Sequence, residues 1–290
     1  GTAANALSIA SFNKPGGITF CHENAHVAED ECGAVEYLTG GSRLSLIPGA
    51  DGKMDLATLE KAIARNPAAF VHGGQPMGIT ITQATEAGTV HALDEIRAIS
   101  AIAKSNNLPL HMDGARFANA LVSLGCSPAE MTWKSGVDIL SFGATKNGCW
   151  CAEAIVVFEK ALDAQMPFLR KRGAQLFSKS RFIAAQFEAY FEGDLWLDSA
   201  RHANAMATVL AEGIAKSGRA RLHTKPQANE VFAILTNADI ERLRAAGAVF
   251  YDWHAPSDGS VKHGETMIRL VTSFATRLEE ADNLIARIKT

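Results

Sequence analysis

The chain has 290 residues and a hydrophobic share of 47%, enough for a buried core. At about 150 residues per domain this length predicts two domains, or one large α/β unit with an appendage. Lysine plus arginine number 28 and aspartate plus glutamate 31, so the net charge of −3 argues against a nucleic-acid or acidic-lipid partner. The apolar runs are far shorter than the ~20 residues needed to cross a bilayer, and no basic-then-apolar leader opens the sequence. Five cysteines, an odd number, indicate reduced thiols and a cytoplasmic protein rather than a disulfide framework.

The first two-thirds of the chain alternates short apolar runs with helical stretches, which is typical of a mostly parallel sheet with helices on both faces. We expect strands at Gly17–Cys21, Arg43–Ile47, Ala69–His72, Ile79–Gln83, Leu108–Met112, Asp138–Phe142 and Ala154–Phe158. We expect helices at Asp55–Arg65 with Asp55 as N-cap and at Ala92–Asn106 closed by Asn106-Asn107. We also expect a short helix and turn at Pro128–Gly136 and a long helical region over Lys160–Phe191. A helical pattern also opens the chain at Gly1 with no strand before it, and we therefore expect that upstream residues are missing.

The pattern changes near Gly193-Asp194, where we expect the domain boundary. This gives a large domain over residues 1–193 and a small C-terminal α/β domain over residues 194–290. The expected elements after the break are a helix at Ser199–Lys216, a strand at Glu230–Leu235, a helix at Ala238–Ala246, strands at Ala248–Trp253 and Met267–Thr272, and a helix at Leu278–Ile288.

Asp113 provides the strongest local signal for chemistry. It ends an apolar run, and ligands of open α/β sheets bind at the carboxyl ends of the strands. A carboxylate there can face a cationic ring nitrogen or a metal, and Arg116 can pair with a carboxylate or phosphate in the same crevice. The alternative is that Asp113 caps the next helix and Arg116 is its exposed partner.

Lys146 follows the next expected strand, in a turn of small residues. A lysine that loses hydration in such a turn has a lowered pKa, which a Schiff-base amine requires. An aspartate and a lysine that end two strands are typical of enzymes that use pyridoxal phosphate, where the lysine holds the aldehyde and the aspartate keeps the pyridine nitrogen protonated. The alternative is a solvated surface charge.

Weaker signals come from the opening residues and from two histidines. Gly1 and Thr2 open a helix whose N–H groups can bind a phosphate, and the hydroxyl of Thr145 can add to that site. His22 and His26 follow the first strand, where a histidine can stack on a planar cofactor or act as a base. Either histidine can instead be a hydrogen-bonded loop residue. The sequence contains no dinucleotide, P-loop, nucleophile-elbow or zinc-protease motif, and no metal site is expected.

Taken together, several segments resemble the low-specificity L-threonine aldolases, the beta-eliminating-lyase branch of fold-type-I pyridoxal-phosphate enzymes. The resemblance covers nearly the whole chain in the right order. The segments that carry it are GTAAN, HENAHVAEDECGA, ITQATEAGTV, LHMDGARFANA, DILSFGATKNG and IRLVTSFAT.

The resemblance implies an α/β fold of the pyridoxal-phosphate-transferase type and a role for each matching residue. Lys146 would form the Schiff base with pyridoxal 5'-phosphate and Asp113 would pair with its ring nitrogen. The further implied residues are His26 over the ring face, Gly1, Thr2 and Thr145 at the phosphate, and Arg116 and Arg269 at the substrate carboxylate. Arg269 has an alternative, a buried ion pair away from the site.

The implied reaction is cleavage of a β-hydroxy-α-amino acid, of the threonine, allo-threonine or phenylserine type, to glycine and an aldehyde. Another pyridoxal-phosphate lyase, a racemase, an aminotransferase or a cofactor-poor truncated remnant remain alternatives. The implied assembly is a homodimer or homotetramer in which the basic run Arg170-Lys171-Arg172 reaches a neighbour's phosphate; the other reading of that run is a solvated helix face.

Two departures from the family pattern accompany the resemblance. A segment of some tens of residues before the phosphate loop, with a serine at the substrate carboxylate, is absent from this sequence. A histidine that many members carry is also absent, because Gln83 and Thr85 stand in its segment. Thr85 thereby becomes a substrate-binding candidate, and the base for the β-hydroxyl is unassigned.

Overall fold

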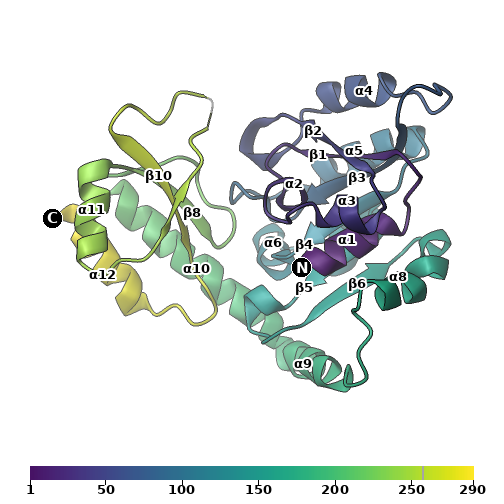
Figure 1. The fold of residues 1–290 in the computed structure, drawn as a ribbon. Helices are drawn as coiled ribbons and strands as arrows, with labels where there is room; N and C mark the ends of the chain where they lie inside the picture. The colour runs from purple at the N-terminus through teal and green to yellow at the C-terminus, as the bar shows by residue number, and fades with distance from the viewer. Residues whose placement is uncertain (257) are drawn as a thin grey trace.

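A six-stranded sheet with the order β2-β1-β3-β4-β5-β6 forms the larger part of the molecule (Figure 1). The computed structural model describes residues 1–256 and 258–290. Strands β1 to β5 run parallel, and β6 pairs antiparallel with β5. The strands are β1 (Gly17–His22), β2 (Arg43–Ile47), β3 (Gln75–Thr82), β4 (Leu110–Gly114), β5 (Ile139–Gly143) and β6 (Glu153–Val157). The expected mostly parallel sheet is confirmed.

Helices cover both faces of this sheet, because alternate side chains of each buried strand point to opposite sides. On one side Phe20 packs with residues of α4, α5 and α6, among them Ile99 and Phe117. On the other side the neighbouring Cys21 packs with residues of α1, α2 and α3, among them Ile9. The helices of this part are α1 (Thr2–Ala10), α2 (His26–Glu29), α3 (Ala34–Leu38), α4 (Leu56–Ala64), α5 (Leu93–Ser105), α6 (Phe117–Leu124) and α7 (Pro128–Met131).

Capping residues in the sequence correctly predicted where two helices begin or end. The side chain of Asp55 accepts a hydrogen bond from the Thr58 N–H at 2.8 Å and begins α4 as an N-cap, as expected. Asn106 is the C-cap of α5, and Asn107 follows with a positive φ of 55°. Helix α7 continues into the 3-10 turn η2 (Trp133–Ser135).

Two expectations were wrong because turn chemistry overrides hydrophobicity. The strand expected at Ala69–His72 is a series of turns, in which the Phe70 N–H donates to Pro67 and Val71 is 88% exposed. The helix expected over residues 160–191 is broken, because α8 ends before Gly173 and Ala174 takes a positive φ of 57°. The observed elements there are η4 (Lys160–Gln165), α8 (Met166–Arg172), α9 (Arg181–Phe191) and η5 (Glu192–Asp194).

The C-terminal part contains a second sheet of four antiparallel strands in the order β7-β8-β10-β9. Its buried face packs on the helices of this part through Val231, Ile268 and Ile285. The observed elements are β7 (Arg221–Leu222), β8 (Glu230–Thr236), α11 (Asn237–Ala245), β9 (Tyr251–Trp253), β10 (Glu265–Val271) and α12 (Leu278–Lys289). Strand β9 is shorter than the expected strand at Ala248–Trp253.

A long helix, α10 (Leu195–Ala215), joins the two sheets. It contacts α6 beside the larger sheet and α12 and β8 of the smaller one, and Figure 1 shows it running diagonally between them. Within the described residues no helix, α10 included, combines the length and apolar character that a bilayer crossing requires.

Candidate active site

Asp113 lies in β4 at the carboxyl edge of the larger sheet and is buried, with 2% of its surface exposed. Its Oδ2 accepts a hydrogen bond from Nδ2 of Asn5 on α1 at 2.7 Å. Its Oδ1 accepts one from the Ala115 N–H at 2.9 Å. The N-cap of α6 is Arg116. Asp113 is therefore not a helix cap but a buried carboxylate at the edge where ligands of such sheets bind.

Lys146 lies in the 3-10 turn η3 (Thr145–Asn147), which follows the strand beside Asp113. Although the residue is solvent-accessible, the surrounding protein takes hydration from its amine, and this desolvation is the main cause that lowers the pKa of Lys146. The charge of Arg116 lowers that pKa further, while the carboxylates of Asp113 and Glu230 act against the shift. A lowered pKa increases the share of neutral amine, the form that attacks a carbonyl.

His26 begins α2, directly after β1 reaches the same edge. Its Nδ1 lies 3.0 Å from Oε1 of Glu31, and its backbone N–H donates to Oε1 of Glu86 at 2.8 Å. The hydrogen bond to Glu31 is the main cause that raises the pKa of His26; burial and the charge of Lys146 lower it, and the charge of Asp113 raises it. The electrostatic neighbours of His26 thus include both Asp113 and Lys146.

Two arginines, one that follows β4 and one on β10, meet one buried carboxylate. The side chain of Glu230, at the start of β8, is 0% exposed. Nη2 of Arg116 lies 2.9 Å from its Oε1, and Nη1 of Arg269 on β10 lies 3.7 Å from the same oxygen. The guanidinium of Arg269 also stacks over the ring of Trp253, 4.1 Å from its centre. Arg269 therefore has a protein carboxylate as partner, and that partner brings it to Arg116.

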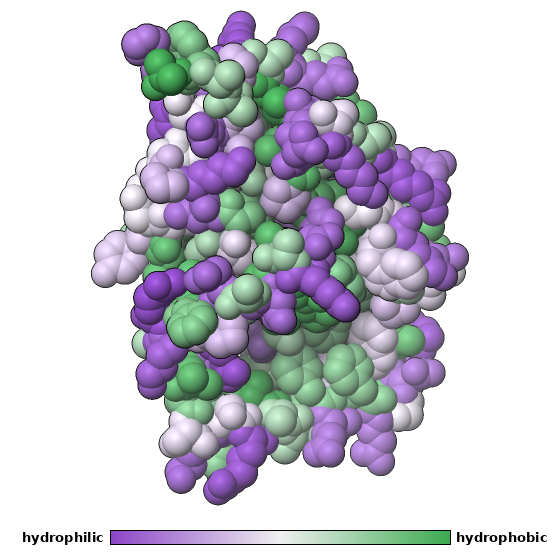
Figure 2. Space-filling view, turned by 90° about the vertical axis from the view of Figure 1, so that its right-hand side faces the viewer, coloured by the Kyte–Doolittle hydropathy of each residue, from purple (hydrophilic) through white to green (hydrophobic). Residues whose placement is uncertain are grey.

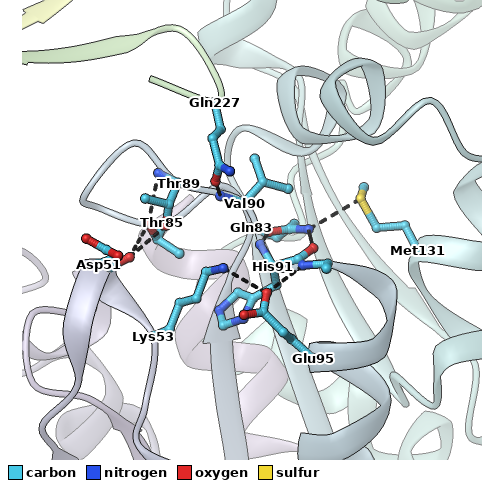
Figure 3. Close-up of polar contacts among 11 residues, drawn as sticks. Asp51, Lys53, Gln83, Thr85, Thr89, Val90, His91, Glu95, Met131 and Gln227 are labelled. Atoms are coloured by element: carbon cyan, nitrogen blue, oxygen red, sulfur yellow. Dashed lines mark hydrogen bonds and ion pairs between the residues drawn. The ribbon is translucent and has the colours of Figure 1, made fainter. Parts of the chain in front are cut away.

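Thr85 and His22 point their polar atoms into the protein. The hydroxyl of Thr85 is 3.1 Å from the Asp51 carbonyl oxygen, to which it donates, and 2.8 Å from the hydroxyl of Thr89 (Figure 3). Nε2 of His22 lies 3.0 Å from the carbonyl oxygen of Gly49. The hydroxyl of Thr85 is thus used within its own loop. His22 is the last residue of β1 rather than a loop residue, and its ring is hydrogen-bonded to the backbone.

The loop that carries Thr85 and Glu86 is held from two sides. The side-chain amide of Gln83 donates to the His91 carbonyl at 3.0 Å and accepts from the His91 N–H at 2.9 Å. Gln227, from the segment before β8, accepts from the Val90 N–H at 2.7 Å (Figure 3). The loop is therefore fixed to both the larger sheet and the C-terminal part.

Gly1 and Thr145 lie together on the wall of a groove of about 940 Å³. The Thr145 hydroxyl accepts from the Ala152 N–H at 3.1 Å, and Thr2 begins α1, whose first N–H groups lack intrahelical acceptors as in every helix. Arg170, in the last turn of α8, lines the same groove. Figure 2 shows apolar side chains around a hollow in the lower half of the face that it presents.

The structure adds four polar residues that the sequence analysis did not select: Asn5, Glu31, Glu86 and Glu230. Three of them lie in segments already quoted for the resemblance. Most of their partners are far away in the chain, as with Asn5 and Asp113, whereas Glu31 lies close in sequence to His26. Desolvation and the charge of Asp113 raise the pKa of Glu86 from 4.5 to about 7. The one signal that could have found them is a polar residue on an otherwise buried face, as Asn5 is on α1.

Comparison with known proteins agrees with this arrangement. The family model described as beta-eliminating lyase matches residues 1–238. The low specificity L-threonine aldolase of Pseudomonas aeruginosa is 42% identical over 290 residues, which is 100% of this chain and 80% of that protein. The enzyme of the same name from a Pseudomonas species is 43% identical over 252 residues, 87% of this chain and 72% of that one.

A solved structure described as Leishmania major threonine aldolase matches with a TM-score of 0.90 and 30% identity, over 100% of this chain and 81% of that one. Both the sequence and the fold thus match the same kind of protein over the whole chain. The chain belongs to the beta-eliminating lyase family, in its low-specificity L-threonine aldolase branch.

Proposed function

We propose that this chain is a pyridoxal-phosphate-dependent aldolase that cleaves a β-hydroxy-α-amino acid, of the threonine, allo-threonine or phenylserine type, to glycine and an aldehyde. The observation that carries the proposal is the placement of Lys146 and Asp113 at one sheet edge, where the charges of Arg116 and Glu230 also act on Lys146 and where Arg269 reaches Glu230. The full-length identity to an L-threonine aldolase supports it.

The residues present fit pyridoxal 5'-phosphate. An amine with a lowered pKa, a buried carboxylate and a helix start with free N–H groups are the three partners that its aldehyde, ring nitrogen and phosphate need. Lys146 would hold the aldehyde, Asp113 the ring nitrogen, and Gly1, Thr2 and Thr145 the phosphate. When bound, the cofactor supplies an electron sink for the pair that the breaking Cα–Cβ bond leaves behind.

The remaining residues orient the substrate. Arg116 and Arg269 would hold the carboxylate of the substrate. This contact fixes how the substrate is turned at Cα, and the orientation decides which of the bonds to Cα can break. The charges of Asp113 and Lys146 act on His26, which would lie over the face of the cofactor ring. The loop of Thr85 and Glu86 lies next to His26, because the side chain of Glu86 accepts a hydrogen bond from the His26 backbone N–H. This loop would form the wall of the substrate site beside His26.

The proposal extends to domains, assembly and location. The large domain comprises residues 1–193 and the small domain residues 194–290, and the active form is a homodimer or homotetramer. Exposed apolar side chains on α8 and α9, such as Phe168 at 63% and Phe182 at 57%, support a contact between copies beside the groove that Arg170 lines. The five free cysteines fit a cytoplasmic enzyme.

One assay tests the function. The protein with pyridoxal phosphate is given a panel of β-hydroxy amino acids while glycine release, aldehyde release and the visible spectrum are recorded. We expect stoichiometric glycine and aldehyde. Racemised or transaminated product without glycine would contradict the proposal in favour of another pyridoxal-phosphate reaction, and a colourless protein would favour a cofactor-poor remnant. Sedimentation of the active protein as a monomer would contradict the proposed assembly.

A further inference from the structure

A buried carboxylate, Glu31, binds the ring of His26. The side chain of Glu31 is 0% exposed, and its Oε1 lies 3.0 Å from Nδ1 of His26. The same oxygen accepts a hydrogen bond from Nδ2 of Asn5 at 2.9 Å, and this amide nitrogen also donates to Oδ2 of Asp113 at 2.7 Å. The four side chains therefore form one continuous chain of contacts from the histidine to the buried aspartate.

The burial of Glu31 demands a positive partner. An ionised carboxylate that leaves water without compensation is strongly destabilising. Among the described residues His26 is the one ion-pair partner of Glu31, and Oε2 of Glu31 has no hydrogen-bond partner. Within the part of the chain that the structure describes, the protonated ring of His26 is the charge that can compensate this carboxylate, so a neutral His26 would leave Glu31 without an ion-pair partner.

Asn5 fixes this pair relative to Asp113. Its Nδ2 faces two carboxylate oxygens, which only accept hydrogen bonds. A flipped amide would place its own oxygen against both carboxylates, so the orientation of Asn5 is determined. The two carboxylates share the two N–H groups of one amide, which holds them at a fixed separation.

Charged groups from three other elements face His26. Asp113 lies on β4, Lys146 in η3, and Glu86, which accepts the His26 backbone N–H, in the loop after β3. Lys146 opposes a positive ring and Asp113 favours it. Glu31 is the group in direct contact with the ring, so it decides the balance.

We propose that Glu31 is a positioning residue for the reaction: it holds the His26 ring through Nδ1 and keeps that ring protonated, while Asn5 fixes the pair relative to Asp113. A protonated ring cannot accept the proton of the substrate's β-hydroxyl. His26 would therefore act through its charge and through contact with the face of the bound cofactor's ring, and a different group is the base. This role in catalysis rests on the proposed function, whereas the protonation of His26 can be measured without it.

The test is an NMR titration of the histidine ring nitrogens in the 15N-labelled holoenzyme, with the His26 signal assigned by its loss in His26→Asn. In the native protein we expect a midpoint above the ordinary value of about 6.5. Glu31→Gln keeps the shape of the side chain but removes its charge, and should lower the midpoint by about one pH unit or more. The alkaline limb of the kcat profile should move to lower pH in the same variant.

Glu29→Gln is the matched control, because Glu29 is an exposed carboxylate on α2, three residues from His26. It should leave both the midpoint and kcat unchanged. A native midpoint at or below 6.5 overturns the proposal without any variant, even if Glu31→Gln does not fold, and so does an unchanged midpoint in a folded Glu31→Gln. A raised midpoint in a protein that releases no glycine would instead support the Glu31–His26 pair and contradict the proposed function.

Discussion

Two buried carboxylates compensate the positive charges of this site in different ways. Glu31 pairs with one histidine and stays within the larger sheet and its helices. Glu230 meets two arginines, one after β4 and one on β10 of the second sheet. The first pair depends on a proton, because histidine loses its charge near neutral pH, while arginine stays charged throughout. The pair of Glu31 and His26 is therefore sensitive to pH. The group of Glu230, Arg116 and Arg269, here called the permanent group, keeps the charges of its arginines and joins the two sheets.

Lys146 is linked to both groups, since the charges of Asp113, Arg116 and Glu230 all act on its amine. Lys146→Ala should abolish turnover and the visible absorbance of the bound cofactor, because no other amine occupies this position. Borohydride reduction of the native protein followed by peptide mapping is the direct measurement. A pyridoxyl label on another lysine, such as Lys171 or Lys179, would contradict the assignment.

Glu230→Gln should break the permanent group and produce the largest change in stability. Removal of one partner leaves two largely buried guanidinium groups without a carboxylate, and we expect a loss of about 3 kcal/mol in the free energy of unfolding. Chemical denaturation at several pH values measures it. Glu212→Gln, which removes an exposed ion pair with Lys216, is the control and should have little effect.

The pH dependence separates the two carboxylates. The pKa of His26 is raised on folding, so the stability from its pair with Glu31 is complete below the unfolded pKa and is lost as pH rises through the folded pKa. The stability difference between native protein and Glu31→Gln should shrink over that range. The difference for Glu230→Gln should stay constant, and an equal pH slope for both variants would contradict the comparison.

The sequence predicted the parts of the site that depend on local signals. Asp113, Lys146 and Arg116 end or follow strands whose apolar runs are visible in the sequence, and the buried strands confirm those runs. Glu230 was not predicted, because its partners Arg116 and Arg269 are far away in the chain and only the fold brings such groups together. The fold likewise brings together Asn5 and Asp113, which are 108 residues apart. Ala69–His72 failed for the opposite reason: its first three residues are apolar, but turns after Pro67 leave them without a neighbouring strand.

Arg269→Lys tests whether the permanent group also binds substrate. Lysine keeps the charge but loses the two-pronged contact with a carboxylate and the flat stacking on Trp253. If Arg269 holds the substrate, KM for the amino acid should rise about tenfold, equivalent to about 1.4 kcal/mol, with the cofactor absorbance unchanged. Melting temperature and KM are measured on one preparation. A lower melting temperature with unaltered KM would remove Arg269 from the site and leave it the role of an ion pair with Glu230.

Glu86→Gln should produce the smallest change in the free energy of unfolding. The sign of this change shows whether the charge of Glu86 is compensated. Burial and the charge of Asp113 raise the pKa of Glu86 from 4.5 to about 7, so the folded protein binds a proton there that the unfolded chain releases. Stability therefore falls as pH rises from about 4.5 to about 7, in contrast to the usual behaviour of a paired carboxylate. Glutamine keeps an oxygen that accepts the His26 N–H but carries no charge. The variant should therefore be more stable than the native protein at pH 8 and equally stable near pH 4.5. We expect a difference at pH 8 of about 1 kcal/mol, because the residue is partly exposed. Thermal unfolding at the two pH values measures the difference. A variant less stable than the native protein at pH 8 would mean that the charge of Glu86 is compensated, and Glu86 would then join Glu31 and Glu230 as a third carboxylate that stabilises the site.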